Sequence, residues 1–194
     1  MVRRTRAEME ETRAALIAMA RIVFSEKGYA ETSMDDLTAQ AGFTRGALYH
    51  HFGDKKGLLA AVVKQIDSEM DHQLQFISDH AENTWLGFSQ RCHRYLDMAL
   101  EPEFQRIVLR DARAVLGGSS LESQKDCIDS MQELIEKLLQ ENVIEPVDPQ
   151  AIASLIYGSL TEAAFWIAEG GDNVQRSIHA RAALDLLLRG LLVK

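Results

Sequence analysis

Residues 32–52, TSMDDLTAQAGFTRGALYHHF, constrain the fold most strongly because they fit two short amphipathic helices separated by a glycine turn. Ser33 can cap the first helix, and Asp36, three positions later, completes a capping-box pattern. Gly42 lets the chain leave that helix through a left-handed residue, and Thr44 can cap the second helix. Such short helices are not stable in isolation, so they need a third helix to pack against. This pattern predicts a helix-turn-helix, whose second helix is offered to the DNA major groove.

Apolar residues recur at helical spacing along the rest of the chain. The segment 8–27 ends at Gly28 and is the expected third helix of the head. We expect further helices at about 54–78, 84–100, 103–116, 121–142, 149–169 and 174–192. There is no strand candidate, so the prediction is an all-α fold of about nine helices.

The distribution of charge favours the N-terminal end as the DNA-binding part. The whole chain carries a net charge of −8, which argues against binding through bulk electrostatics. Residues 1–56 contain nine Lys and Arg against eight Asp and Glu, whereas the remainder contains twelve against twenty-one. Arg3, Arg4 and Arg6 precede any predicted helix and form a basic arm. We therefore expect binding to rely on a few placed cations and backbone donors.

The N-terminal third also resembles the DNA-binding domain of the TetR family of bacterial transcriptional regulators. The matching residues are Thr32–Ser33, Leu37, Ala41–Gly42–Phe43, Thr44, Gly46, Leu48–Tyr49, His51–Phe52, Lys55, Leu58–Leu59 and the preceding segment FSEKGYA. One departure is Thr38, where the family usually carries alanine. The resemblance implies a three-helix helix-turn-helix head at residues 1–56 and a larger helical domain for ligand binding and dimerisation at residues 57–194.

The outward side of the recognition helix carries Thr44, Arg45, Gly46, Tyr49 and His50. Arg45 can donate two hydrogen bonds to O6 and N7 of guanine, and Gly46 permits close backbone approach. Tyr49 and His50 can bond to phosphate or base edges, although Tyr49 can equally pack between helices.

Three further residues, Thr32, Ser33 and Lys55, lie at helix starts, where backbone donors and a cation favour phosphate. For Lys55 the alternative is a solvated surface charge. The family resemblance favours the DNA-binding role for the group as a whole.

Aromatic and polar side chains in the C-terminal part are candidates for a ligand cavity, since such cavities are apolar with a few polar groups. The candidates are Trp85, Phe88, Cys92, Tyr95, Phe104, Arg110, Met131, Tyr157, Glu162 and Trp166. The alternative for each is plain core packing. Arg110 can pair with an anionic ligand or with an acid such as Glu162. The family resemblance implies such a cavity without saying which residues line it.

The last two predicted helices, about 149–169 and 174–192, carry more apolar surface than a monomer's exterior can hold. Gly158, Ser159, Ala163 and Ala164 are small enough for close helix approach. These helices form either the core of the monomer or a two-fold, four-helix dimer interface. The family resemblance favours the homodimer.

Nothing in the sequence indicates catalysis, a cofactor or a metal. The six histidines form no i, i+4 pair, and there is no HExxH or clustered Cys/His spacing. No apolar run approaches the ~20 residues that span a bilayer, and the N-terminus lacks the apolar part of a secretory signal. Cys92 and Cys127 fit a reducing cytoplasm, and a redox role for either stays open.

The sequence therefore predicts a cytoplasmic, homodimeric, ligand-responsive transcriptional regulator, most simply a repressor of a palindromic operator. Its expected partners are double-stranded DNA, a second copy of itself and an unknown small-molecule effector, with no membrane. The alternative is a helical small-molecule-binding protein or enzyme that retains an unused helix-turn-helix head.

Overall fold

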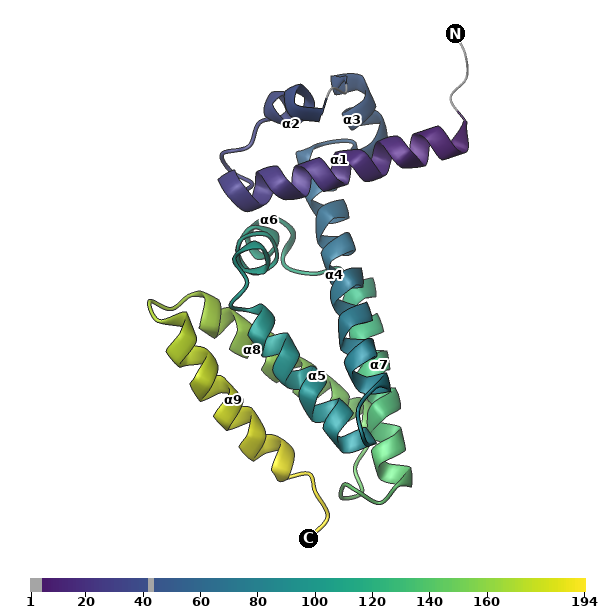
Figure 1. Cartoon of the computed structure of the whole chain (residues 1–194), viewed down its shortest axis with the longest axis vertical. Coiled ribbons are helices and arrows are strands. Elements are labelled where there is room, and N and C mark those ends of the chain that lie inside the picture. The colour runs from purple at the N-terminus through teal and green to yellow at the C-terminus, as the bar shows by residue number, and fades with distance from the viewer. Residues whose placement is uncertain (1–4, 42–43) are drawn as a thin grey trace. The chain divides into compact units, whose positions relative to one another are not determined.

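The computed structural model describes residues 5–41 and 44–194, and the described chain is helical (Figure 1). Its elements are α1 Arg6–Lys27, α2 Met34–Ala41, α3 Arg45–Phe52, α4 Lys55–Asp79, α5 Thr84–Met98, the π-helix η1 Phe104–Ala112, α6 Arg113–Leu116, α7 Leu121–Gln140, α8 Pro149–Ala168 and α9 Asn173–Arg189. Over the described residues the only β-type pairing is an isolated bridge between Ile144 and Leu192. The all-α fold predicted from the sequence is confirmed.

The chain folds into two compact units, each made from two stretches of sequence. Unit 1 comprises Met1–Ile66 and Arg106–Ser119, and unit 2 comprises Asp67–Gln105 and Ser120–Lys194. This division differs from the expected boundary after residue 56, because unit 1 includes the first half of α4 and the segment that begins within η1. Two helices, α4 and η1, are therefore continuous from one unit into the other.

The short helices of unit 1 begin at the predicted caps. The Ser33 backbone N–H donates to Oδ2 of Asp36 at 3.0 Å, and the Asp36 N–H donates to Oγ of Ser33 at 3.0 Å, which completes the capping box. Oγ1 of Thr44 accepts from the N–H of Ala47 at 3.2 Å. The Asp54 carboxylate accepts from the N–H of Gly57 at 2.7 Å at the start of α4. The caps at Ser33 and Thr44 are those predicted from the sequence. The predicted turn residue Gly42 lies outside the described residues.

The apolar faces of these helices form the core of unit 1. The fully buried side chains come from all four helices: Leu16, Ala20 and Phe24 of α1, Leu37 of α2, Leu48 of α3, and Leu58 and Leu59 of α4. Helices as short as α2 and α3 owe their stability to this burial rather than to their own propensity. The outward side of α3 is consequently held in place by its buried side.

The end of α1 is joined to the segment that begins within η1. Gly28 has φ 82°, in the left-handed region that favours glycine, and a Cβ there would collide with the Arg106 guanidinium. Nη2 of Arg106 donates to the Lys27 carbonyl at 2.7 Å, and the Tyr29 N–H donates to Oδ2 of Asp111 at 2.7 Å. These contacts, all within unit 1, explain why Arg106–Ser119 belongs to it.

The segment predicted as one short helix over residues 103–116 is instead a nine-residue π-helix, η1, followed by the four-residue α6. A π-helix has a wider turn than an α-helix, and hydrophobic spacing in so short a segment does not separate the two. The paired glycines Gly117 and Gly118, at φ 86° and 109°, follow the end of α6.

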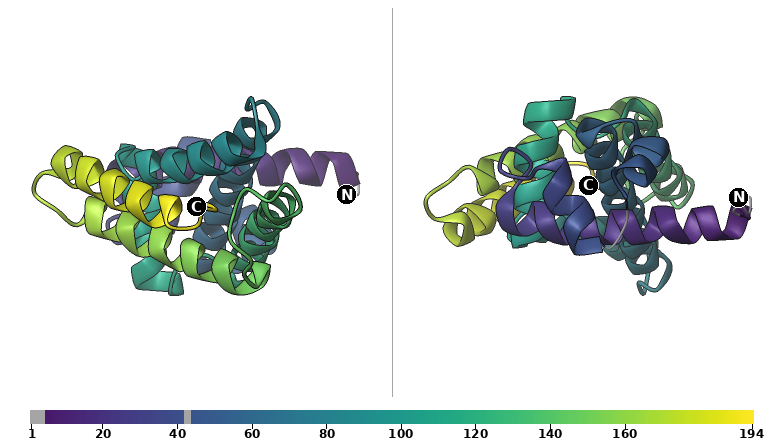
Figure 2. Two further views of the ribbon diagram at one scale, coloured as in Figure 1. Left: turned by 90° about the horizontal axis from the view of Figure 1, so that it is seen from below. Right: turned by 90° about the horizontal axis from the view of Figure 1, so that it is seen from above.

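Unit 2 is a helical bundle in which α5 contacts α7, α8 and α9, and α8 contacts both α7 and α9 (Figures 1 and 2). Asp148 caps α8 through a 2.7 Å hydrogen bond from the N–H of Ala151, and Pro149 occupies the first turn. One face of α8 is buried through Ala153, Ile156, Leu160, Ala164 and Ile167. Ala164 thus packs within the unit, contrary to its expected place at a dimer interface.

The sequence analysis found no apolar run of about 20 residues, and for α8 this was an underestimate. Over the described residues α8 is the one helix long and apolar enough, by length and composition, to cross a membrane. A single helix of this kind is weak evidence, because core helices of soluble proteins meet the same criterion. Packing on α5, α7 and α9 accounts for the buried part of its apolar surface.

Candidate DNA-binding surface and ligand cavity

The recognition helix α3 presents its predicted polar residues to solvent. Thr44, Arg45, Gly46, Tyr49 and His50 are all exposed, Tyr49 to 48%. An exposed aromatic residue next to exposed donors is an arrangement that can reach the edges of bases and the phosphates. The alternative reading of Tyr49 as a residue packed between helices does not agree with this exposure.

Arg45 is paired with an acid of the preceding helix. Its Nε lies 2.8 Å from Oδ1 of Asp35 in α2, and both side chains remain largely exposed. Sequence analysis did not single out Asp35, since a first-turn acid of α2 also suits the helix dipole.

Thr32 and Lys55 take part in hydrogen bonds within unit 1. Thr32 is 1% exposed, and its hydroxyl donates to the Gly28 carbonyl at 2.7 Å. Nζ of Lys55 donates to the carbonyls of Tyr29 and Thr32, both at 2.8 Å, and lies 4.2 Å from the centre of the Tyr29 ring. The burial of Thr32 argues against a phosphate contact by its side chain, and Lys55 has one of its three N–H donors left for such a contact.

The remaining predicted DNA contacts lie at the N-terminal end and before α2. Arg3 and Arg4 lie outside the described residues, whereas Arg6 is exposed at the start of α1. That start carries a capping box that sequence analysis missed, formed by Thr5 and Glu8. Ser33 is exposed at the start of α2, although its hydroxyl donates to Asp36 at 2.7 Å.

Unit 2 contains an inner cavity formed by side chains of α4, α5, α7 and α8. Its volume is about 20 Å³, and it is lined by Met70, Leu74, Arg91, Cys92, Tyr95, Cys127, Met131, Tyr157 and Leu160. Cys92, Tyr95, Met131 and Tyr157 were predicted as ligand-binding residues, and the cavity brings these four together. A space of this size accommodates about one water molecule, so a larger guest has to displace side chains.

Arg91 is the charged residue of this cavity and was missed because a lone arginine in an amphipathic helix resembles a surface residue. It is only 3% exposed. Its Nη1 donates to Oγ of Ser130 at 3.1 Å, its Nη2 lies 3.9 Å from Oδ1 of Asp71, and its Nε has no hydrogen-bond partner. A buried guanidinium with an unused donor is costly unless another acceptor reaches it.

The thiols and phenol hydroxyls around the cavity are held in their neutral forms. Burial raises the pKa of the Cys92 and Cys127 thiols to about 12, and for Cys127 the nearby Asp71 and Asp67 act in the same direction. Burial likewise raises the pKa of the Tyr95 and Tyr157 hydroxyls. The thiols are therefore poor nucleophiles, which argues against a redox role for either cysteine.

Six of the ten predicted ligand-binding residues do not line the cavity, among them Trp85, Phe88, Phe104 and Arg110. Phe88 is fully buried with its ring centre 6.2 Å from that of Trp85, and Phe104 is 3% exposed with its ring 6.3 Å from that of Tyr95. For Phe88 and Phe104 the structure favours the alternative of plain core packing. Arg110 is exposed, so it is not the buried partner of an anion that its apolar neighbours in sequence suggested.

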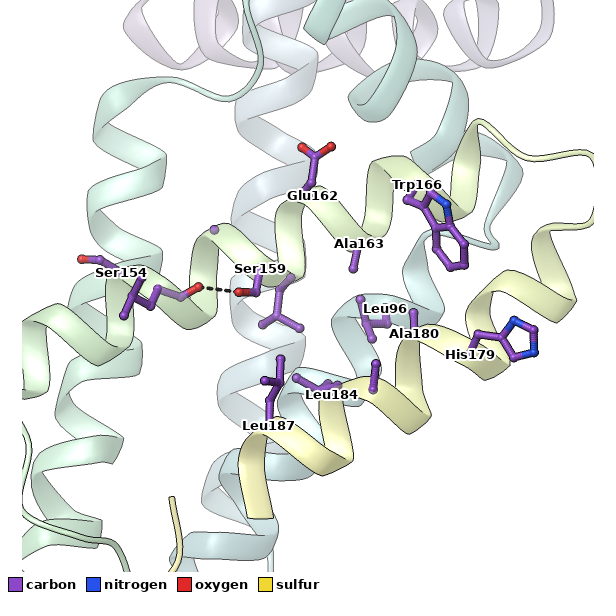
Figure 3. Close-up of a pocket in the computed structure, with 14 residues that line it drawn as sticks. Leu96, Ser154, Ser159, Glu162, Ala163, Trp166, His179, Ala180, Leu184 and Leu187 are labelled. Atoms are coloured by element: carbon purple, nitrogen blue, oxygen red, sulfur yellow. Dashed lines mark hydrogen bonds between the residues drawn. The ribbon is translucent and has the colours of Figure 1, made fainter. Parts of the chain in front are cut away.

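An open groove lies between α8 and α9, which we call the α8–α9 groove (Figure 3). Its volume is about 880 Å³, and small and apolar residues such as Gly158, Ala163, Leu184 and Leu187 line it. Leu187 is 61% exposed, and a Cβ at Gly158 would meet nothing within 4 Å.

Glu162 and Trp166, both predicted to bind a ligand, line this groove instead of the inner cavity. Figure 3 shows the Glu162 carboxylate directed away from α9. The Trp166 ring is 43% exposed and lies 4.8 Å from the Arg176 guanidinium. Glu162 interrupts an apolar helix because it lies on the exposed side of α8.

An ion pair and a histidine–carboxylate hydrogen bond hold α9 against α5. Arg181 Nη1 contacts both oxygens of Asp97, at 2.5 and 2.6 Å, and Nε2 of His93 lies 2.7 Å from Oδ1 of Asp185. They keep α9 in place while much of its surface stays exposed, including Val174, Ile178 and Leu186. Residues 5–41 and 44–194 contain no group of three or more His, Cys, Asp or Glu that could hold a metal ion.

Comparisons with known proteins agree with this arrangement. The family model described as "Tetracyclin repressor-like, C-terminal domain" matches residues 85–191, and "Bacterial regulatory proteins, tetR family" matches residues 16–62. The chain belongs to the TetR family. It is 72% identical to a TetR-family transcriptional regulator from Pectobacterium atrosepticum, whose crystal structure it matches with a TM-score of 0.95 over 98% of this chain and 99% of that chain.

Two further TetR-family relatives are more distant. The Transposon Tn10 TetC protein of Escherichia coli is 31% identical over 186 residues, 95% of this chain and 92% of that protein. The HTH-type transcriptional regulator TtgR of Pseudomonas putida is 35% identical over 134 residues, 69% of this chain and 60% of that protein. The predicted family and the predicted class of function, a DNA-binding transcriptional regulator, are thus confirmed. The relatives are regulators, not enzymes.

Proposed function

We propose that this TetR-family protein is a ligand-responsive repressor that binds a two-fold symmetric operator as a homodimer in the cytoplasm, without catalytic chemistry. The observation that carries the proposal is the exposed polar side of α3 above a buried apolar side. Arg45, Tyr49 and His50 supply donors for base edges and phosphates, and Thr44 and Gly46 allow close approach of the helix start. Arg6, Ser33 and the third donor of Lys55 are further candidates for phosphate contacts.

The α8–α9 groove supports the homodimer. It is an apolar surface rimmed by polar side chains such as Ser154 and His179, and the exposed large side chains Leu155, Trp166 and Leu187 line it. Three further large apolar side chains of α9 are exposed: Val174, Ile178 and Leu186. Apolar patches of this kind mark interaction surfaces, and a two-fold axis would place the same patch of a second copy against it. The small residues Gly158 and Ala163 permit close approach of the partner's helices.

The inner cavity supports the response to a ligand. Its walls are apolar apart from the hydroxyls of Tyr95 and Tyr157 and the guanidinium of Arg91, whose Nε lacks an acceptor. Flexible methionines such as Met70 and Met131 can yield to a guest. Asp67 and Asp71 lie near Cys127 of the cavity, and their carboxyl groups disfavour a negatively charged ligand. The effector class we propose is therefore a compact, mostly apolar molecule with a neutral oxygen acceptor, such as a carbonyl or hydroxyl group.

Selection of duplexes from a random library by the purified protein tests the DNA-binding part. We expect an enriched site of two inverted half-sites whose centres lie roughly 34–36 Å apart or a multiple of that distance. Footprinting on the region upstream of the protein's own gene then locates the natural operator. Failure to enrich any sequence at low salt would instead favour a small-molecule-binding protein with an unused head. An enriched site without inverted symmetry would contradict the dimer.

A thermal-shift screen with compact ketones, phenols and esters tests the effector class. A compound that raises the melting temperature should release the enriched duplex, and the shift should be lost in Arg91→Met. Stabilisation that persists in Arg91→Met would contradict the role given to Arg91. Replacement of Arg110, which is exposed, by methionine provides the matched control.

A further inference from the structure

Arg45 and Asp35 form an ion pair on the surface that we assign to DNA. Arg45 is the first residue of α3, Asp35 is the second residue of α2, and Nε of Arg45 lies 2.8 Å from Oδ1 of Asp35. The side chains are 59% and 69% exposed. Ion pairs this exposed contribute little to stability, so the packing of α2 and α3 does not depend on this one.

The geometry of the pair determines which donors of Arg45 remain for a second partner. A guanidinium has five N–H donors in a rigid, planar fork. Because Asp35 occupies the Nε edge, the two terminal amino groups stay outside the ion pair. Two such groups match O6 and N7 of guanine, the acceptors that this base presents in the major groove. The carboxylate thus fixes the plane of the fork and leaves its two-donor end for a base.

We propose that Asp35 is a positioning residue, which holds Arg45 for end-on recognition of a guanine and thereby sets the specificity of the recognition helix at one base pair of each half-site. This inference rests on the proposed binding of DNA by α3. It extends that function to a residue of α2 that need not touch DNA itself.

The charge of Asp35 contributes to discrimination in a second way. A carboxylate near the duplex is repelled by the phosphates, whatever the sequence. Hydrogen bonds from Arg45 to guanine offset this repulsion at the correct base pair, whereas at another base pair the repulsion remains without compensation. Specificity arises from such a difference between the correct and incorrect sites.

The neighbouring acid, Asp36, has a different task. Its Oδ2 accepts from the N–H and the hydroxyl of Ser33, at 3.0 and 2.7 Å, so the N-terminus of α2 is capped without Asp35. The hydrogen bonds from Ser33 lower the pKa of the Asp36 carboxyl. Asp35 is therefore not needed for the cap and can pair with Arg45. As an acid in the first turn of α2, it also interacts favourably with the helix dipole. An experiment must separate these two roles.

The experiment uses the full-length protein and the duplex enriched from the random library. Affinities are measured for that duplex and for three matched duplexes that differ only at the base pair whose preference is lost in Arg45→Ala. The variants are Asp35→Ala, Asp35→Asn, Arg45→Ala and the double variant Asp35→Ala/Arg45→Ala. Glu31→Ala, which removes another exposed acid from the head, is the matched control for charge. Melting curves show whether each variant is folded.

The wild type should prefer guanine by about 5- to 150-fold, the range of one two-pronged contact. Asp35→Ala should reduce this preference at least about threefold and bind the three mismatched duplexes more tightly, because the phosphate repulsion is gone. Asp35→Asn keeps an oxygen acceptor for Nε and should retain more of the preference than Asp35→Ala. In the Arg45→Ala background the removal of Asp35 should not change the base preference.

Three results would overturn the proposal. One is an unchanged guanine preference in Asp35→Ala. Another is an Asp35→Ala variant that melts at a lower temperature and binds all four duplexes more weakly by the same factor, with or without Arg45, which would mean that Asp35 acts through the fold of α2. A third is a wild-type preference for cytosine on the contacted strand that depends on Asp35 alone, because a carboxylate can itself accept from that base. In each case the wild type still binds its enriched duplex, so the proposed function survives. Failure to enrich any duplex would refute both the role of Asp35 and the proposed function.

Discussion

At the scale of single residues, polar side chains that sequence analysis assigned to DNA also stabilise the head itself. Lys55 is the clearest case, because its ammonium group donates to the carbonyls of Tyr29 and Thr32 and lies over the Tyr29 ring. These bonds satisfy carbonyls of the turn between α1 and α2. We therefore expect a substitution of Lys55 to change the stability of the head, in addition to removing the phosphate contact that we propose for this residue.

We predict that Lys55→Met lowers the free energy of unfolding by about 1–3 kcal/mol, since hydrogen bonds that involve a charged group are lost. For a chain of this length each kcal/mol shifts the melting temperature by roughly 2–4 °C. Lys56→Met, the adjacent and exposed lysine, should melt like the wild type. Equal melting temperatures for the two variants would show that the internal bonds of Lys55 contribute nothing.

The two thiols provide a prediction about pH. Their pKa of about 12 means that Cys92 and Cys127 stay neutral in the folded protein far above the ordinary thiol value of 9.0. At pH 8 roughly one thiol in 10⁴ is ionised, so both should react with a disulfide reagent about a thousandfold more slowly than a free cysteine. Thiols of the unfolded chain ionise first, so stability should fall as the pH rises from about 9 to 12. Rapid labelling of the native protein at pH 8 would contradict this prediction.

At the scale of helices, the start signals were the most predictable feature. Capping residues such as Ser33, Thr44, Asp54 and Asp148 are local chemistry and can be read from sequence spacing. The π-helix η1 was not predictable, because its wider turn is accompanied by no distinct pattern of apolar residues. Its junction with the end of α1 depends on Arg106 and Asp111, which lie about 80 positions after their partners Lys27 and Tyr29 in the sequence. A single sequence contains no signal for a pairing over such a separation.

The junction between η1 and α1 can be tested at the Tyr29 amide, which donates to Asp111. In Asp111→Ala this amide should exchange with solvent about tenfold faster or more, because it has lost its acceptor. Asp111→Asn keeps an oxygen acceptor and should show an intermediate rate. Asp126→Ala, an exposed acid of unit 2, should leave the rate unchanged. Identical protection in wild type and Asp111→Ala would mean that the bond does not form in solution.

At the scale of the whole molecule, the sequence predicted two parts but not how the chain divides between them. The inner cavity was predicted through its aromatic and sulfur-containing side chains, whereas Arg91 was missed, because burial is a tertiary property that residue type does not reveal. Both α4 and η1 are continuous across the boundary of the units. We propose that these two helices carry the response from cavity to head.

In the proposed homodimer, operator binding by two heads depends on the α8–α9 groove, so the groove is where we test the assembly. Leu187→Glu puts a charge into an apolar surface that we expect a second copy to cover, and the resulting unpaired charge should prevent association. Because Leu187 is 61% exposed in the single chain, the fold of each subunit should be preserved. We expect a monomer by sedimentation at micromolar concentration, with a circular dichroism spectrum like that of the wild type.

The same variant should bind the two-half-site duplex at least about 100-fold more weakly, because linkage of two heads raises avidity by roughly 10²–10⁴. Its affinity for a single half-site should match that of a wild-type head, since α3 is untouched. Leu121→Glu makes the same change at a residue that is 84% exposed and lies outside the groove, and it should remain dimeric and bind normally. A dimeric Leu187→Glu would remove the groove from the interface. A monomeric variant that still binds the full operator tightly would show instead that each head acts alone, which would contradict a spacing imposed by the dimer.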